Sequence, residues 1–268
     1  MVEGGAARGT WSPPSDPWLL WGDCRAVMRD LPDGVFDLVF ADPPYNLSRA
    51  RGMRSAFSSH VTPTEAWDRF TDMDFEIFNE QWLTEAWRVL RPGGSLFVSG
   101  TYHSIFSVGA LVKRLPDCKV VNDVVWFKPN AQPNITCRTL KQSTETLVWA
   151  AKGKGWTFNY RDSKAANGGK QMTNLWPIPL TPASEKRHGG KHPAQKPLTL
   201  MRRVLEVATR VGDLVLDPFA GTGTTLVACR ELGRRGVGIE VDEDGYGTII
   251  RRRVKGVQGR LAVSDSKA

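Results

Sequence analysis

The chain has 268 residues, of which 41% are hydrophobic and 24% charged, and its net charge is +8. These values exclude a wholly disordered chain and fit one large α/β domain with an inserted lobe. No run approaches the ~18 apolar residues of a membrane helix, and the amino terminus has no signal-peptide core, so we expect a cytoplasmic protein. The four widely spaced cysteines predict neither a metal site nor a disulfide framework.

The first half of the chain alternates short apolar runs with segments of helical spacing, after an irregular leader at residues 1–17. The expected strands are residues 18–22, 35–40, 95–99 and 120–127. The expected helices are residues 25–31, 65–90 and 105–115, the second of which ends at an Arg-Pro-Gly-Gly stretch.

One of these strands, residues 35–40, ends in Asp42-Pro43-Pro44-Tyr45. The two prolines stop the strand and hold Asp42 and Tyr45 rigidly past its carboxyl end, where open α/β sheets bind ligands. Asp42 and the carbonyl of Pro43 can accept both hydrogens of an exocyclic amino group, while Tyr45 stacks on the heterocycle that carries it. On its own, the pattern is equally typical of a strand that ends in a Pro-Pro turn.

Positive charge is concentrated between residues 128 and 195, where eleven Lys or Arg face three acids. This surplus equals the net charge of the whole chain, and the segment also carries interleaved aromatics and one expected strand, 144–151. The pattern favours a nucleic acid partner over a solvated basic surface. Together with a basic loop that follows Tyr45, it supplies the candidate DNA contacts Arg49, Arg51, Arg54, Arg138, Lys141, Lys186 and Arg187.

A second ligand-binding pattern lies near the carboxyl end. After an amphipathic helix at 197–209, strand 214–216 runs into a Gly-x-Gly turn, which is followed by helix 224–232, strand 237–239 and Glu240. Strand, glycine turn, helix, strand and acid are the layout of a nucleoside-binding unit. The turn lacks the third glycine of the dinucleotide fingerprint and the Gly-Lys-Ser/Thr of a triphosphate loop, so NAD and ATP are disfavoured. A short helix and a loose terminus are expected after about residue 245.

Three motifs in this order carry a resemblance to a known family. Asp42-Pro-Pro-Tyr45-Asn-Leu, then His192-Pro-Ala-Gln-Lys-Pro197, then Phe219-Ala-Gly-Thr-Gly-Thr224 resemble the DNA amino-methyltransferases of the beta group, over residues 18–245. The resemblance implies the Rossmann-like, seven-stranded mixed sheet of class I methyltransferases, circularly permuted, with an inserted target-recognition region. It divides the chain into leader 1–17, catalytic half 18–127, basic target-recognition region 128–195, cofactor half 196–250 and basic tail 251–268.

The same resemblance implies S-adenosyl-L-methionine as cofactor and assigns residues to its parts. It places Asp217, Phe219, Gly221, Gly223 and Thr224 around the methionine part and Glu240 on the ribose. It places Asp23 and Cys24 beside the adenine ring, and His192 and Lys196 in the segment that closes on the amino-acid end. We expect Gly223→Asp to abolish cofactor binding and leave the fold intact.

The implied reaction is site-specific methylation of an exocyclic amino group in double-stranded DNA. Because a paired base is inaccessible, the target must be flipped out of the duplex. Asp at the first motif position favours adenine N6, with cytosine N4 as the alternative. RNA or protein-glutamine methylation, and a DNA-binding protein without turnover, are further alternatives. A homodimer and a cognate restriction endonuclease are partners that the sequence neither requires nor excludes.

Overall fold

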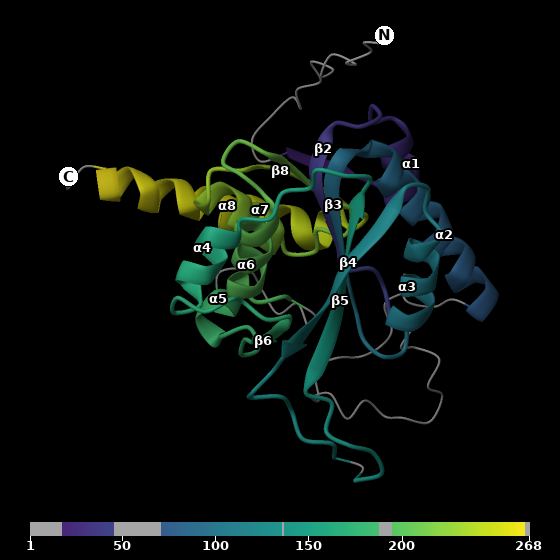
Figure 1. Ribbon diagram of the computed structural model, residues 1–268. Coiled ribbons are helices and arrows are strands. Elements are labelled where there is room, and N and C mark those ends of the chain that lie inside the picture. The colour runs from purple at the N-terminus through teal and green to yellow at the C-terminus, as the bar shows by residue number, and fades with distance from the viewer. Residues whose placement is uncertain (1–17, 46–70, 136, 188–194, 266–268) are drawn as a thin grey trace.

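The computed structural model describes residues 18–45, 71–135, 137–187 and 195–265 (Figure 1). Its strands are, in chain order, β1 (Trp18–Trp21), β2 (Phe36–Ala41), β3 (Leu90–Gly100), β4 (Cys118–Phe127), β5 (Thr144–Lys152), β6 (Leu175–Pro177), β7 (Leu214–Asp217) and β8 (Arg235–Glu240). Within this part of the chain they form one mixed sheet in the order β1-β8-β7-β2-β3-β5-β4-β6. Of these strands, β5 runs antiparallel to both neighbours, and every other pair is parallel.

The resemblance implied a sheet of seven strands, but the described residues form a sheet of eight. The additional strand is β6, a three-residue edge strand that pairs with β4 through Trp176 and Trp126. It lies in the segment that the sequence indicated as irregular. Three residues carry too little periodicity for a strand to be found there, so its pairing comes from tertiary contacts.

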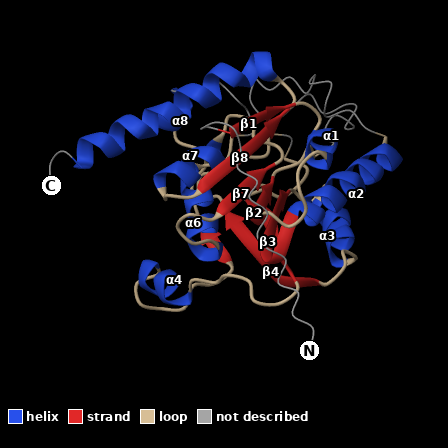
Figure 2. Cartoon of the chain, turned by 90° about the horizontal axis from the view of Figure 1, so that it is seen from above, coloured by secondary structure: helices blue, strands red, loops and turns tan. Residues whose placement is uncertain are grey.

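Helices cover both faces of the sheet (Figure 2). They are α1 (Cys24–Arg29), α2 (Asp72–Val89), α3 (Ile105–Lys113), α4 (Tyr160–Ala166), α5 (Ala183–Arg187), α6 (Leu198–Ala208), α7 (Thr224–Glu231) and α8 (Glu243–Asp265). The first three pack on one face, and α6, α7 and α8 pack on the other. None of the described helices combines the length and the apolar character that a membrane crossing requires.

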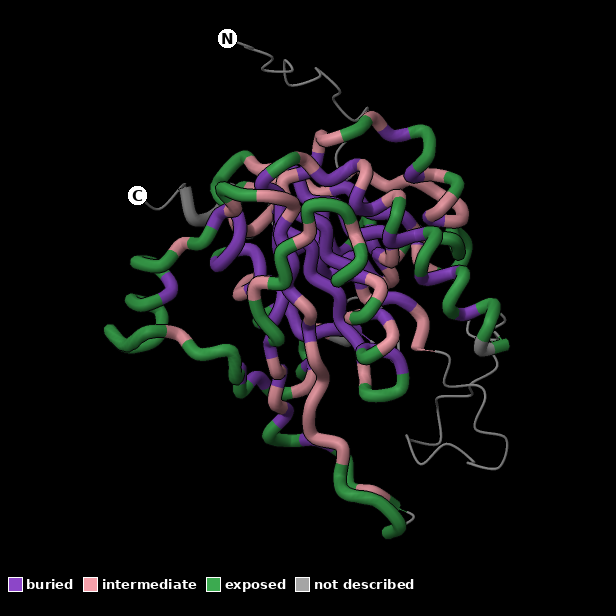
Figure 3. The backbone as a smooth tube through the Cα atoms, turned by 45° about the vertical axis from the view of Figure 1, so that its right-hand side comes forward, coloured by how far each residue is buried: buried purple, intermediate pink, exposed green. Residues whose placement is uncertain are grey.

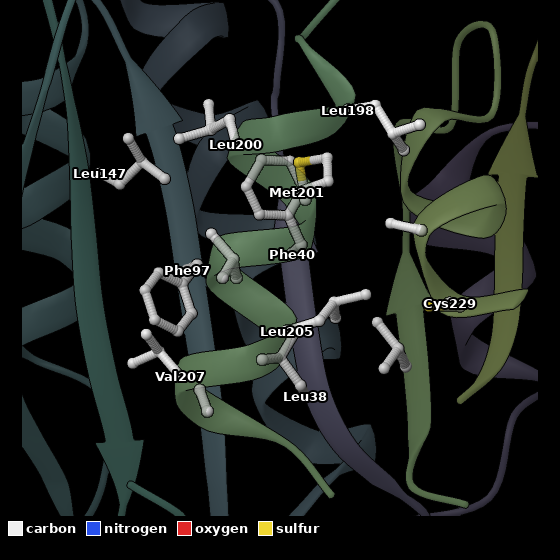
Figure 4. Close-up of a cluster of buried hydrophobic side chains, with 14 of the residues drawn as sticks. Leu38, Phe40, Phe97, Leu147, Leu198, Leu200, Met201, Leu205, Val207 and Cys229 are labelled. Atoms are coloured by element: carbon white, nitrogen blue, oxygen red, sulfur yellow. The ribbon is translucent and has the colours of Figure 1, made fainter. Parts of the chain in front are cut away.

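The central strand β2 is buried on both faces, as its mostly apolar sequence predicts, and only Asp37 is partly exposed. Leu38 and Phe40 face the core under α6, whereas Val39 and Ala41 face the core under α1 and α2. Figure 4 shows the first of these cores, in which α6 lies across β2 and β3. The sheet is therefore a rigid platform at the point where β2 ends.

Two expected boundaries were wrong. The strand expected at 95–99 begins at Leu90, directly after α2 ends at Val89, so the Arg-Pro-Gly-Gly stretch lies inside β3 and is not a separate turn before it. The tail is not a short helix, because α8 extends over 23 residues and its far end points away from the sheet (Figure 1). Ile250 and Val254 of α8 are buried, and Arg253 donates to the carbonyl and hydroxyl of Thr222. The basic tail 251–268 therefore begins inside a docked helix.

The order of the strands brings the two predicted half-sites together. β2 pairs in parallel with β7, with Leu38 beside Val215 and Val39 beside Leu216. Their carboxyl ends therefore lie at the same edge of the sheet, as ligand sites of open α/β sheets require. Because β5 runs the opposite way, its amino-terminal end lies at this edge too.

Candidate active site

Asp42 lies just past the end of β2 and is largely buried, with 18% of its side chain exposed. Its Oδ2 accepts a hydrogen bond from the Lys196 ammonium at 2.6 Å, and its Oδ1 accepts one from the Tyr45 hydroxyl. Lys196 also donates to the Tyr45 oxygen at 2.9 Å. The motif therefore folds into a compact polar cluster, and Lys196, which the resemblance placed near the cofactor, directly contacts it.

Two further members of this cluster were missed by sequence reasoning. Glu145 at the start of β5 has its Oε2 at 3.3 Å from the Lys196 ammonium, and its Oε1 accepts from Lys128 at 3.1 Å. Lys128 follows β4 directly. The available signal was a charged pair flanking two adjacent expected strands, but its use requires knowing that the strands are antiparallel.

Opposite charges in this buried cluster act against the effect of burial. Burial raises the pKa of Asp42, and the ammonium of Lys196 opposes that rise. Burial works against ionisation of Glu145 too, but Lys196 and Lys128 outweigh it and lower its pKa. The two carboxylates outweigh burial at Lys196 and hold its pKa well above the ordinary value. Two acids and two ammonium groups therefore alternate beside Tyr45.

The glycine-rich turn is organised by Asp217 at the end of β7. Its Oδ1 accepts from the backbone N–H of Phe219 at 3.0 Å, and its Oδ2 accepts from the Thr225 hydroxyl at 2.5 Å. Burial raises the pKa of Asp217 to about 7. Phe219 itself packs edge-on against Trp82, with ring centroids 5.3 Å apart. Asp217 and Phe219 therefore shape the turn.

Gly221 and Glu240 form the part of this turn that fits a nucleoside cofactor. The N–H of Gly221 donates to Glu240 Oε2 at 2.8 Å, and the glycine has a left-handed φ of 51°. A Cβ at Gly221 would meet no described atom nearer than 4.0 Å, so the backbone borders open space. A carboxylate held at a strand end beside an open glycine turn is suited to ribose hydroxyls.

At Gly223, glycine is required by the backbone conformation and by close packing against α8. Its φ is 75°, and an added Cβ would lie 2.7 Å from Cγ2 of Ile250 in α8. Thr224 next to it is buried, with its hydroxyl 3.2 Å from the Arg253 guanidinium. This geometry argues against the expectation that Gly223→Asp leaves the fold intact, because the new side chain would have to displace that of Ile250.

Asp23 and Cys24 stand at the end of β1, next to the end of β8. The N–H of Gly22 donates to the carbonyl of Glu240 at 2.9 Å, which brings Asp23 to the same edge as Glu240. Asp23 caps α1 by accepting from the N–H of Arg25 at 2.8 Å, and it forms an ion pair with that guanidinium. Cys24 is buried in the core under α1.

The remaining predicted residues are not all placed by the structure. His192, Arg49, Arg51 and Arg54 lie outside the described residues, and the side chains of Lys186 and Arg187 in α5 are not described. Arg138 and Lys141 are exposed on the loop between β4 and β5, which extends away from the body of the protein (Figure 3). These two residues are not part of the buried cluster around Asp42.

Fold and site together define an α/β enzyme that binds a nucleoside cofactor beside an acidic Pro-Pro-Tyr turn. The chain belongs to the DNA methylase family, whose model matches residues 36–251. It is therefore an S-adenosylmethionine-dependent DNA methyltransferase of the class that modifies adenine N6 or cytosine N4. The resemblance inferred from the three motifs is confirmed, and the circular permutation stays a prediction.

Named relatives support this assignment over most of the chain. The chain is 39% identical over 242 residues to the Type II methyltransferase M2.DpnII of Streptococcus pneumoniae, covering 88% of this chain and 89% of the relative. It is 37% identical over 241 residues to M2.LlaDCHI of Lactococcus lactis subsp. cremoris, covering 88% of each. The crystal structure of the M1.HpyAVI–SAM complex has a TM-score of 0.65 and 26% identity, and the match covers 88% of this chain and 98% of that one.

Proposed function

We propose that Asp42, Pro43 and Tyr45 receive the exocyclic amino group of a base flipped out of duplex DNA. The observation that carries this proposal is the position of Asp42. It follows β2 at the sheet edge where β7 leads into the glycine-rich turn, so an amine on Asp42 would lie close to a cofactor on that turn. Pro43 is buried and Tyr45 partly buried, which suits a preorganised site.

The proposed chemistry follows from the residue types. An exocyclic amino nitrogen is a poor nucleophile while its lone pair is delocalised into the ring. When Asp42 and the Pro43 carbonyl accept its two hydrogens, the nitrogen can pyramidalise, and Asp42 stabilises the positive charge that develops there. The bound cofactor supplies an electrophilic methyl group. The protein contributes alignment and hydrogen bonds and needs no covalent intermediate.

For the cofactor we propose that Gly221, Glu240 and Asp23 form the nucleoside side of the site. The N–H of Gly221 and the Glu240 carboxylate lie 2.8 Å apart across the open turn, and Asp23 stands beside them at the end of β1. Asp217 and Phe219 stabilise the turn through the hydrogen bond from the Phe219 N–H to the Asp217 carboxylate. Lys196 contacts Asp42 and Tyr45 on the other side of the site.

Adenine N6 is the target that we favour, because Asp42 occupies the first position of the Asp-Pro-Pro-Tyr motif. Cytosine N4 is the second candidate, since the class covers both amino groups. The test is mass spectrometry of nucleosides from duplex DNA treated with enzyme and cofactor. N6-methyladenine is the expected product, and N4-methylcytosine alone would overturn the adenine assignment. Methyl transfer to RNA or to a glutamine peptide, without any to DNA, would overturn the proposed function.

DNA is proposed to bind along the loop between β4 and β5 and the segments near it. Arg138 and Lys141 are exposed on this loop. Lys128 and Lys152 belong to the same basic segment but make contacts within the protein. Lys128 pairs with Glu145, and Lys152 donates to the carbonyl of Leu90 at 2.7 Å. A cognate restriction endonuclease is a further proposed partner, since the relatives are named Type II methyltransferases. A homodimer stays a prediction that sedimentation would test.

A further inference from the structure

The Lys196 ammonium occupies the place that the proposed function gives to the target amino group. Its Nζ lies 2.6 Å from Asp42 Oδ2, 2.9 Å from the Tyr45 oxygen and 5.3 Å from the centroid of the Tyr45 ring. A target amine bonded to Asp42, on a base stacked against Tyr45, needs the same acceptor and the same side of the ring. Lys196 and the target therefore compete for one position.

Glu145 offers the ammonium a second acceptor within reach. Its Oε2 is buried and makes no hydrogen bond to any described residue, although the Lys196 Nζ lies only 3.3 Å away. Its other oxygen, Oε1, is already held by Lys128. A charge-assisted N–H···O bond is normally about 2.7–2.9 Å long, so a small displacement of the ammonium completes the missing bond. A buried acceptor without a hydrogen bond costs free energy. The Lys196 ammonium can therefore move to this oxygen favourably.

We propose that Lys196 is a displaceable occupant of the amine site, and that Glu145 is a positioning residue that takes over its ammonium when the target amine binds Asp42. This inference rests on the proposed function of Asp42. The exchange leaves each buried carboxylate with hydrogen-bond donors, because Asp42 then accepts from the amine, and Glu145 lies between Lys196 and Lys128. The 3.3 Å distance between the Lys196 ammonium and Glu145 Oε2 means that the exchange requires only a small displacement.

The charged groups around Asp42 set the sign of the expected pH effects. Lys196 faces it from the segment before α6, Glu145 from β5, Asp217 from β7 and Tyr45 from its own turn. Asp42 must be ionised to accept the amine, so the single-turnover rate rises as the pH passes its pKa. Neutralising Lys196 raises that pKa. Neutralising Glu145 lowers it, because an acid is removed and Lys196 stays on Asp42.

The experiment is a single-turnover pH profile of methyl transfer to duplex DNA. Glu145→Gln is expected to slow transfer at least about tenfold and to move the acid limb to lower pH, because Lys196 stays on Asp42. Lys196→Met is expected to move the acid limb to higher pH. Lys128→Met, a variant that leaves Glu145 and Lys196 intact, should also move it upward, because Glu145 then draws Lys196 away from Asp42.

The double variant separates exchange from simple structural support. Once Lys196 is methionine, no ammonium needs a second acceptor, so adding Glu145→Gln should change the rate less than about twofold. Glu231→Gln is the matched control. It breaks the 2.8 Å ion pair with Arg202 between α6 and α7, and it should leave rate and acid limb unchanged. Calorimetry with S-adenosylmethionine follows cofactor affinity in each variant.

Several outcomes would overturn the inference and leave the proposed function standing. One is equal slowing by Glu145→Gln with and without Lys196, and an unmoved acid limb is another. A third is loss of cofactor binding in Lys196→Met with the pH profile unchanged, which would assign Lys196 to the cofactor alone. Full activity of Asp42→Ala is a separate result, because it would remove the proposed function itself.

Discussion

Asp217 shows how a single buried carboxyl couples the cofactor turn to pH. It is 4% exposed, and its two partners are the Phe219 N–H and the Thr225 hydroxyl. Neither partner carries a charge, so burial dominates and raises the pKa from its ordinary 3.8 to about 7. A carboxyl with a raised folded-state pKa binds its proton more tightly when folded. Its ionisation therefore destabilises the fold as the pH rises from about 4 to about 7.

Asp217→Asn is expected to flatten that pH dependence. The amide keeps an acceptor for the Phe219 N–H and cannot ionise. The difference in free energy of unfolding between pH 4 and pH 8 should therefore shrink by up to about 4 kcal/mol, at 1.36 kcal/mol for each pH unit of pKa shift. Urea unfolding at both pH values measures it. An unchanged difference would show that Asp217 titrates near its ordinary pKa.

For single residues, the sequence predicted the site residues that belong to the motifs. It did not predict the charged side chains that contact them. Asp42 and Tyr45 stand past a buried strand, as the Pro-Pro turn required. Glu145 and Lys128 could not be foreseen, because their convergence on Lys196 depends on β5 running antiparallel to β4. Strand direction is set by the pairing of distant segments and leaves no local mark in the sequence.

The glycine-rich turn and α8 are coupled as elements through Gly223. The turn passes so close to Ile250 that a Cβ on Gly223 would overlap its side chain at 2.7 Å. Arg253, one helical turn further, donates to the carbonyl of Thr222 at 2.7 Å. The helix after the last strand therefore fixes the shape of the cofactor turn from outside.

Gly223→Ala is expected to destabilise the protein by roughly 2–4 kcal/mol, from a left-handed φ and overpacking together. Gly153→Ala is the matched control, because its φ of 71° is nearly the same and an added Cβ meets nothing within 4 Å. It should lose only about 1 kcal/mol, the left-handed backbone cost. Thermal or urea unfolding of both variants gives the comparison. Equal losses would mean that Ile250 moves aside freely.

The elements with strong periodicity were predicted well, and those without it were not. The amphipathic pattern at 197–209 became α6, and the apolar runs became β2, β7 and β8. The short elements α4, β6 and α5 were missed because each has too few residues for a pattern. The length of α8 was missed because its polar sequence carries only a few buried positions.

For the whole molecule, the net charge of +8 does not translate directly into a DNA-binding surface. Lys128 and Lys152 belong to the basic segment, but they donate hydrogen bonds to Glu145 and to the backbone carbonyl of Leu90. The exposed charges on the loop between β4 and β5 remain, among them Arg138 and Lys141. The sequence predicted the location of the charge and could not show which side chains turn inward.

Replacing Arg138 and Lys141 by alanine is expected to weaken binding to all duplex sequences alike. Each lost phosphate contact lowers the slope of log affinity against log salt by about 1, so the pair should lower it by about 2. The control replaces Lys113 and Arg114, exposed at the far end of α3, and should leave the slope unchanged. If the loop variant also keeps the slope, the DNA lies elsewhere.

The central claim is that Asp42 accepts the target amine, and the single-turnover rate of Asp42→Ala on duplex DNA tests it most directly. Cofactor and DNA affinities should remain close to those of the unaltered protein, because the contact acts mainly in the transition state. The rate should fall by about 100-fold or more, as when one preorganised hydrogen-bonding group is lost. Asp162→Ala, exposed on α4, should keep the full rate. If Asp42→Ala also keeps it, Asp42 only terminates a strand.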